Sequence, residues 1–154
     1  MPTFDYDMSG MAGARKAIHN LAEQIENPPA KMIHRLGEAS LEDVDKRFMT
    51  RGYNTWPADS EETIKKKGQA MVLIDTGAMY NSARISGWTR NSITVDVPYG
   101  GKNHDPDVPR YHQSGTKHMP QRKIIEVTRK LNLALTDVLK KWVEDMIMAF
   151  GKGV

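Results

Sequence analysis

One amphipathic segment near the C-terminus constrains the fold more than any other feature of the sequence. Between residues 128 and 150, apolar side chains recur three and four residues apart, which is the spacing of one face of an α-helix. These apolar residues are Leu131, Leu135, Val138, Leu139, Trp142, Met146, Ile147 and Phe150. The charged residues that lie mainly off this face are Lys130, Asp137, Lys141, Glu144 and Asp145. We therefore expect a long C-terminal helix over residues 128–150 that buries its apolar face against the rest of the chain.

The first third of the chain predicts two more helices, separated by Asn27-Pro28-Pro29. A residue before proline is pushed out of the helical region, so the first helix, over residues 10–26, ends there. Its apolar face carries Ala14, Ile18, Leu21 and Ile25. The second helix is expected over residues 30–51, with Gly52 as its C-cap. Its apolar face carries Ile33, Leu36, Ser40, Val44 and Phe48.

The middle of the chain predicts short elements joined by long connections. Residues 59–67 open with a capping residue and acidic side chains and end on lysines, an order that suits the dipole of a short helix. Residues 84–89 and 92–97 are strand-like and are joined by a short link, so they predict an antiparallel hairpin. Residues 122–127 are a candidate third strand. Residues 98–120 contain four prolines and predict a long loop.

Together these elements predict a single α+β domain in which helices flank a small antiparallel sheet. The chain of 154 residues divides into N-terminal helices (1–51), a connector with the hairpin and the long loop (52–127), and the C-terminal helix (128–150). A sheet of two or three strands leaves edges that invite pairing between subunits, so we expect an oligomer.

Composition excludes several function classes. The chain has no cysteine, which excludes disulfides, thiolate metal ligands and a cysteine nucleophile. Its longest apolar stretch, residues 71–74, is far too short to span a bilayer, and its acidic N-terminus carries no apolar signal core. We therefore expect synthesis in a cytoplasm and no membrane association.

Histidines and aspartates are concentrated in the long loop, which raises the alternative of a metal site. His104, Asp105, Asp107, His112 and His118 lie within fifteen residues of one another, and such ligands suit zinc or a similar divalent ion. However, none of their spacings matches a familiar metal site. The chain also lacks a nucleophile elbow and a complete phosphate-binding glycine loop. A metal-dependent hydrolase remains an alternative, although solvated or hydrogen-bonded loop residues explain the cluster more simply.

The basic residues leave open a second alternative, a small DNA-binding protein. The net charge is +3, and cations gathered near aromatic residues could neutralise phosphates regardless of sequence. The candidate cations are Lys65, Lys66, Lys67, Arg84, Arg90, Lys117, Arg122, Lys123, Arg129 and Lys130. Acidic residues are interspersed among them, and no known DNA-binding motif is present. A mixed, solvated surface is the simpler explanation of the charge.

Three ordered motifs resemble a known family. The first is W-P-x-x-S-x-x-T, followed by lysines, at residues 56–63. The second is L-x-D-T-G-x-[LM]-x-x-S at residues 73–82, and the third is H-Q-x-G with a hydrophobic-Pro-x-Arg at residues 112–122. In this order, after a helical N-terminus, they resemble the tailed-bacteriophage virion morphogenesis family, which covers tail-completion and neck proteins of Mu-like and related phages and prophages. The chain departs from the family pattern just before His112 and just after Arg122.

The resemblance implies a structural, non-enzymatic subunit with no catalytic residue, cofactor or metal site. It implies action at the head–tail junction, beside other junction proteins and in a homo-oligomeric ring through which DNA would pass without sequence-specific binding. The protein would be made in the bacterial host cytoplasm and end in the neck or tail of the virion. The residues that would form subunit contacts or define the family fold are Trp56, Pro57, Asp75, Thr76, Gly77, Ser82, His112, Gln113, Gly115, Pro120 and Arg122.

Physical chemistry suggests roles for these motif residues. Trp56-Pro57 would be a rigid apolar plug on the sheet, because Trp buries a large area. Asp75 would cap a tight turn in which Gly77 takes a conformation that side chains disfavour. His112-Gln113 would satisfy backbone groups of the loop, and Arg122 would bind a carboxylate in its own subunit or in a neighbour. The long loop and the hairpin edge are the expected joining surfaces.

Overall fold

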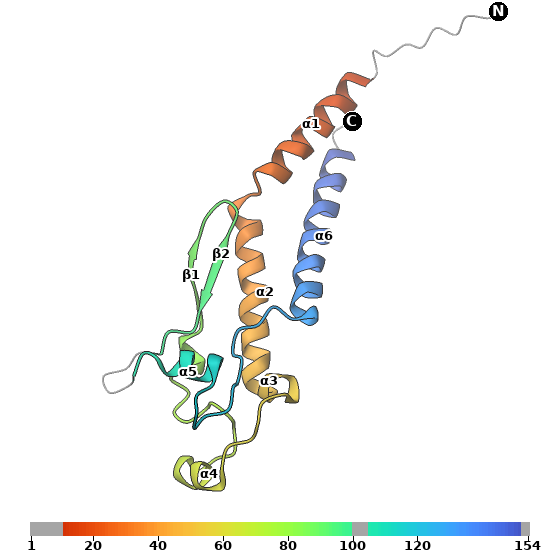
Figure 1. Cartoon of the computed structure of the whole chain (residues 1–154). Helices are drawn as coiled ribbons and strands as arrows, with labels where there is room; N and C mark the ends of the chain where they lie inside the picture. Colours follow the sequence, from red (N-terminus) through yellow and green to blue (C-terminus); the bar gives the residue numbers. More distant parts are fainter. Residues whose placement is uncertain (1–10, 100–104, 152–154) are drawn as a thin grey trace, which may run out of the picture.

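The computed structural model describes residues 11–99 and 105–151. The long helices are α1 (Met11–Glu26), α2 (Ala30–Met49) and α6 (Arg129–Gly151), and the short helices are α3 (Arg51–Asn54), α4 (Glu61–Lys67) and α5 (Val108–Ser114). A 3-10 turn, η1 (Tyr80–Ser82), precedes strands β1 (Arg84–Trp88) and β2 (Ile93–Asp96). These elements confirm an α+β fold with a small antiparallel sheet and a long C-terminal helix (Figure 1).

Helix α2 is the centre of the arrangement. The β1–β2 hairpin packs against one side of it, and α6 runs antiparallel to it on another (Figure 1). Gly37 allows the sheet to approach closely, because a side chain at this position would collide with Ile85 of β1 and Ile93 of β2. A side chain at this position would therefore require these two isoleucines to shift.

The hairpin places its apolar residues toward α2. Ile85 pairs with Val95 and Trp88 pairs with Ile93, with an irregularity in the register just before Gly87. Within the described ranges each strand has a neighbour on one side only, so the outer edges of β1 and β2 are unpaired. Strand β1 forms the side of the molecule that faces away from α6 (Figure 1).

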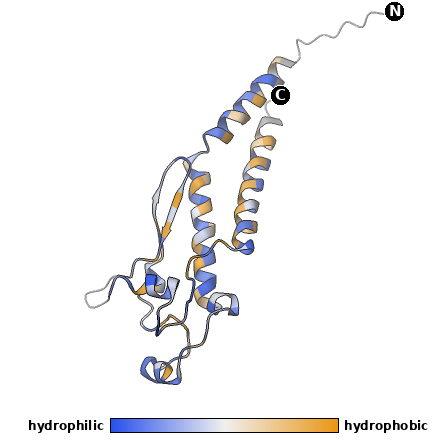
Figure 2. Cartoon of the chain, viewed as in Figure 1, coloured by the Kyte–Doolittle hydropathy of each residue, from blue (hydrophilic) through white to orange (hydrophobic). Residues whose placement is uncertain are grey.

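The buried core lies at the C-terminal end of α2. It comprises Val44, Phe48, Trp56, Val72, Met79, Val97 and Ile124. Phe48 stands edge-on to Trp56 and to Tyr80, with ring centroids 5.8 and 5.5 Å apart. Figure 2 shows hydrophobic residues continuing along α2 and α6 beyond this core. The core thus joins α2 to the connector and to the segment that leads into α6.

A buried arginine fixes the path of the chain into α6. Arg47 is 2% exposed, and its Nε donates a hydrogen bond to Asp43 Oδ2 at 2.8 Å. Its Nη1 and Nη2 donate to the carbonyl oxygens of Lys123 and Glu126, at 3.3 and 3.1 Å. Asp43 also accepts a hydrogen bond from the Tyr53 hydroxyl at 2.7 Å. The buried polar groups of α2 are therefore paired, and Arg47 is bonded to backbone groups more than 70 residues away in the sequence.

Most of the predicted elements are confirmed. Helices α1, α2 and α6 and the hairpin occupy the predicted segments, and α4 begins after Ser60, whose hydroxyl accepts a hydrogen bond from the first turn. Helix α2 ends at Met49, earlier than predicted, with Thr50 as its C-cap. Gly52 instead adopts a φ of 63° in the next turn, where a side chain would collide with the indole of Trp56.

Two predictions about residues 98–127 are wrong. Residues 108–114 form helix α5 rather than loop, because Pro109 occupies the second position of the helix, where the missing N–H costs nothing. Residues 122–127 do not form a third strand. Their backbone groups are instead bonded by the side chains of Arg47 and Gln113. Residues 100–104 of the predicted loop, His104 among them, lie outside the described residues.

Candidate functional site

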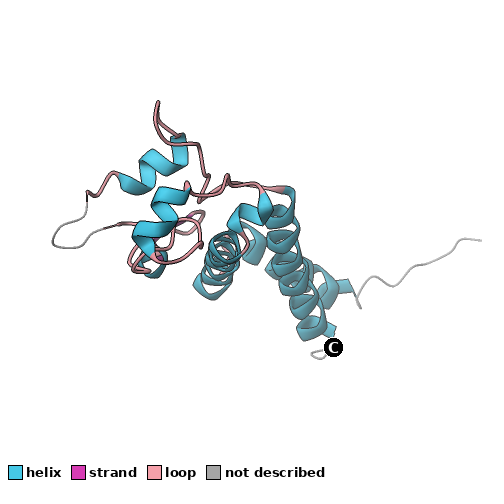
Figure 3. Ribbon diagram, turned by 90° about the horizontal axis from the view of Figure 1, so that it is seen from below, coloured by secondary structure: helices cyan, strands magenta, loops and turns pink. Residues whose placement is uncertain are grey.

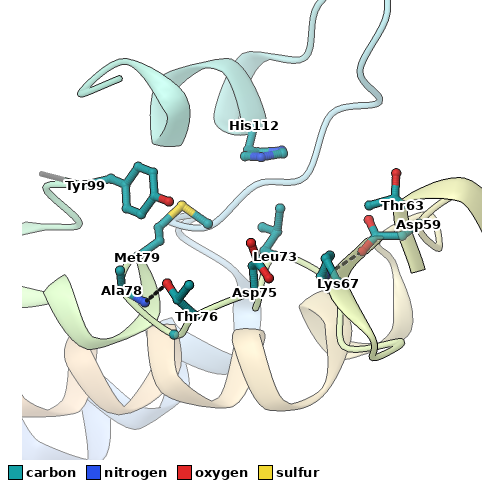
Figure 4. A pocket seen from close by; sticks show the side chains of 11 residues that line it. Asp59, Thr63, Lys67, Leu73, Asp75, Thr76, Ala78, Met79, Tyr99 and His112 are labelled. Carbon is teal, nitrogen blue, oxygen red and sulfur yellow. Dashed lines mark hydrogen bonds and ion pairs between the residues drawn. The ribbon is translucent and has the colours of Figure 1, made fainter. Parts of the chain in front are cut away.

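The three motif segments meet around one cavity of about 170 Å³ (Figure 4). Helix α4 and the residues before it contribute Asp59, Thr63 and Lys67, and the loop before η1 contributes Leu73, Asp75, Thr76, Gly77, Ala78 and Met79. Tyr99, which follows β2, and His112 of α5 complete the lining. Figure 3, which looks up at the molecule from below, shows the short helices and their loops gathered beside the long helices. Distant parts of the sequence therefore supply one site.

Arg122 organises the polar side of this site. Its side chain is 7% exposed, and its Nη2 donates to Asp59 Oδ1 at 3.0 Å. Its Nε and Nη2 also donate to the carbonyl oxygens of Pro57 and Ala58, at 3.1 and 3.2 Å. Lys67 Nζ donates to the other carboxylate oxygen, Asp59 Oδ2, at 2.7 Å. One carboxylate thus binds two cations, and the third motif is tied to the first.

His112 is held in the site by its backbone, since its carbonyl oxygen accepts a hydrogen bond from Arg122 N at 2.7 Å. The imidazole Nδ1 is buried and has no hydrogen-bond partner within the described residues. Burial, reinforced by the positive charge of Arg122, lowers the pKa of His112 to about 4. The imidazole is therefore neutral at pH 7.

The second motif forms the predicted tight turn with a different capping residue. Gly77 has a φ of 80°, which a side chain would disfavour. The hydroxyl of Thr76, rather than the carboxylate of Asp75, accepts a hydrogen bond from Ala78 N at 3.3 Å. The carboxylate of Asp75 lines the cavity (Figure 4) and accepts no hydrogen bond from any described residue. The predicted turn is confirmed, and the predicted Asp75 cap is wrong.

Gln113 fastens α5 to the segment before α6. Its Oε1 accepts hydrogen bonds from Ile124 N and Ile125 N at 2.8 and 3.1 Å, and its Nε2 donates to the Ile125 carbonyl at 2.6 Å. Gly115 follows with a φ of 72°, where a side chain would press on the backbone of Gln121. Gln113 therefore satisfies backbone groups, but those of residues 124 and 125 and not those of the loop. The same prediction for His112 is wrong, because its Nδ1 has no partner within the described residues.

The remaining motif residues are structural or lie at the surface. Trp56 is 6% exposed, packs edge-on against Phe48, and donates from Nε1 to a backbone carbonyl before α6 at 3.2 Å. Its main aromatic contact is thus on α2 rather than on the sheet. Pro57 and Pro120 are exposed, and the Ser82 hydroxyl bonds to a carbonyl at the start of its own turn.

Several motif side chains point into the subunit. Arg122 is only 6% exposed, and its carboxylate partner, Asp59, belongs to the same subunit. Sequence reasoning missed Asp59 and Lys67 as members of the site. The lysine run was explained by the helix dipole or as candidate DNA-binding cations, and Asp59 lies 63 residues from Arg122. Only the fold reveals this cluster.

The cavity offers hydrogen-bonding groups rather than an assembled reactive centre. Neither threonine hydroxyl in the lining, that of Thr63 or that of Thr76, has a hydrogen bond to Asp75 or His112 in the described part of the chain. No group of three His, Asp or Glu side chains that could hold a metal occurs within residues 11–99 and 105–151. The arrangement can accept a hydrogen-bond donor at Asp75, and it holds three chain segments in fixed positions.

Two further findings bear on the class of protein. None of the helices described here is both long enough and apolar enough to cross a membrane. Comparison with known proteins identifies no relative, since no family model, curated protein or solved structure matches the chain.

Proposed function

We propose that this chain is a structural subunit of a tailed-bacteriophage particle and acts at the head–tail junction as a neck or tail-completion protein. Identical copies associate in a ring beside other junction proteins, and DNA passes through the ring without sequence-specific contacts. The subunit is made in the bacterial cytoplasm, has no catalytic role and ends in the virion.

The observation that carries this proposal is the convergence of the three motifs that resemble the virion morphogenesis family. The third motif donates hydrogen bonds from Arg122 to the carbonyls of residues 57 and 58 in the first. His112 of the third motif and Asp75 of the second line the same cavity (Figure 4). Matches that arose by chance along the sequence need not meet in space, so this convergence supports the resemblance.

The surface also supports an assembly subunit. Large apolar side chains that are at least 54% exposed occur on several elements, namely Ile18, Ile25, Trp88, Val127, Leu133, Ile147 and Met148. They lie on α1, at the end of β1 and along α6 and its leading segment (Figure 2). A single subunit leaves these faces in water, whereas contact with other subunits would cover them.

A ring requires a head-to-tail contact between two different surfaces of the same subunit. The described residues offer such a pair, because the outer edge of β1 and the exposed faces of α1 and α6 lie on different sides of α2 (Figure 1). Unpaired sheet edges favour pairing with another chain.

Deletion of the gene from the phage or prophage that encodes the chain tests this proposal. We expect heads and tails that form but do not join, seen by negative-stain electron microscopy, and infectivity restored by a plasmid copy. Normal yields of infectious, joined particles from the deletion strain would refute the proposal.

The alternative of a small DNA-binding protein was based on the basic residues around Arg122. That side chain is buried, and its donors are used by Pro57, Ala58 and Asp59. It is therefore not available to phosphates. A titration with duplex DNA at low salt measures the affinity that the remaining cations give, since phosphate contacts strengthen at low salt. We expect weak binding that does not depend on sequence, and tight sequence-specific binding would revive this alternative.

A further inference from the structure

A groove of about 320 Å³ lies between the first turns of α2 and Trp88, the last residue of β1. Its floor is one face of the first turns of α2, and its wall is Trp88 at the end of β1; the lining residues are Ala30, Lys31, His34, Arg35, Glu38 and Trp88. The indole of Trp88 is 58% exposed although it lies on the apolar side of the hairpin, opposite Ile93. The groove therefore combines an unpaired strand edge with an uncovered aromatic ring.

The groove and the adjacent strand carry an excess of positive charge. The groove lining has one carboxylate, Glu38, against two cations, Lys31 and Arg35, and His34 Nδ1 lies 3.4 Å from Glu38 Oε1. Lys31 and Arg35 have no ion-pair partner within the described residues. The same is true of two further cations, Arg84 in β1 and Arg90 in the hairpin turn. An occupant of this surface should therefore be extended, partly aromatic and acidic.

The first ten residues of this chain have that chemistry. Phe4, Tyr6 and Met8 alternate with Asp5, Asp7 and Ser9, so an extended conformation would place apolar side chains on one face and both carboxylates on the other. Such a segment can add to a sheet edge, with the backbone supplying affinity and alternate side chains supplying specificity.

We propose that residues 3–9 of one copy add as a strand to the outer edge of β1 in a second copy. The side chains of Phe4 and Tyr6 enter the groove beside Trp88, and the carboxylates of Asp5 and Asp7 point to the opposite face, toward Arg84 on the exposed face of β1 and Arg90 in the hairpin turn. This inference rests on the homo-oligomeric part of the proposed function and specifies its joining surface.

The length of α1 requires that the segment come from another copy. Helix α1 has 16 residues and therefore spans about 24 Å at 1.5 Å per residue. It leads away from the hairpin (Figure 1). Met8 is three residues from the start of α1, a reach of about 10 Å, and Phe4 is seven residues from it, a reach of about 24 Å. Residues 4–8 therefore cannot lie along β1 of their own copy, whereas a neighbouring copy can bring its β1 to them.

Engineered disulfides test this contact directly, because the chain has no cysteine of its own. We would combine Ala30→Cys in the groove with Thr3→Cys or with Ser9→Cys, one at each end of the segment, in the full-length chain. Mild oxidation should give a ladder of dimers, trimers and larger species on a denaturing gel without reductant. The control pairs each arm substitution with Lys66→Cys on the exposed side of α4. No ladder above this control, or only an internal link within monomers, overturns the inference.

A charge exchange gives an independent test. Asp5→Lys with Asp7→Lys, or Arg84→Glu with Arg90→Glu, should each weaken self-association by at least about tenfold in sedimentation experiments, because like charges then face each other. All four substitutions together should restore it. Lys65→Glu with Lys66→Glu is the control for the same charge change elsewhere, and circular dichroism checks folding. Unchanged association in both single-sided variants, no recovery in the combined one, or a wild-type chain that stays monomeric, contradicts the inference.

The two proposals fail in distinguishable ways. If the deletion strain makes unjoined heads and tails but the cysteine pairs give no ladder, only the proposed strand addition is wrong. If Arg84→Glu with Arg90→Glu abolishes DNA binding and leaves self-association intact, this surface serves nucleic acid and the inference is overturned.

Discussion

At the scale of single residues, two buried arginines hold parts of the chain that are far apart in sequence. Arg47 connects α2 to the segment before α6, and Arg122 connects that segment to residues 57–59. Breaking a buried ion pair is costly because it leaves an uncompensated charge in the interior. The stability of this fold should therefore depend on these side chains more than on any surface ion pair.

Replacement of Arg122 tests this dependence. Arg122→Ala should lower the free energy of unfolding by about 2–3 kcal/mol, because the carbonyls of Pro57 and Ala58 lose their donor, whereas Asp59 keeps its contact with Lys67. The matched control is Arg110→Ala, since Arg110 is 79% exposed and lies 3.9 Å from Asp107. The control should change stability by less than about 1 kcal/mol. Equal effects of the two substitutions in urea unfolding would contradict the assigned role of Arg122.

His112 should make stability depend on pH. Its pKa is lowered to about 4 in the folded state, from the usual value near 6.5. Between these values the unfolded chain binds more protons than the folded one, so stability present above about pH 6.5 is lost as the pH falls toward 4. His112→Gln should remove the part of this pH-dependent loss of stability that His112 causes. Urea unfolding at pH 7 and pH 5 measures it, and an identical loss in both proteins would show that the imidazole contributes nothing.

At the scale of elements, the sequence correctly predicted the helices and strands whose pattern is local. The apolar periods of α1, α2 and α6 and the short link of the hairpin are visible in the chain itself. Helix α5 was missed because Pro109 was taken as a sign of loop, although proline is acceptable in a first helical turn. The third strand was predicted wrongly for a different reason. Residues 122–127 look strand-like, but side chains from other elements bond their backbone groups.

The attachment of α5 should depend on Gln113. Gln113→Ala removes three hydrogen bonds to residues 124 and 125, and unsatisfied backbone groups cost about 1–3 kcal/mol in total stability. The amides of Ile124 and Ile125 should also exchange faster with deuterium. Ser114→Ala, on an exposed neighbour in the same helix, is the control. Unaltered exchange at both amides in the Gln113 variant would show that α5 is held by other contacts.

At the scale of the whole molecule, the motif residues could be named from the sequence but their partners could not. The turn at Gly77 and the buried Trp56 follow from residue type alone. The pairing of Arg122 with Asp59 and Lys67 depends on how α4, the turn and α5 come together, which no local pattern encodes. The proposed joining surface is likewise a property of the whole molecule, since it would combine β1 and α2 with a segment of another copy.

The central claim is that this chain is a fixed structural component of the head–tail junction. Targeted mass spectrometry of purified infectious particles, with the major capsid protein as the internal standard, tests it most directly. The account predicts peptides of this chain at a small, constant number of copies per particle, retained with neck and tail fractions after the particles are broken open. Particles that are fully infectious yet contain no peptide of this chain above the level of host contaminants would contradict it.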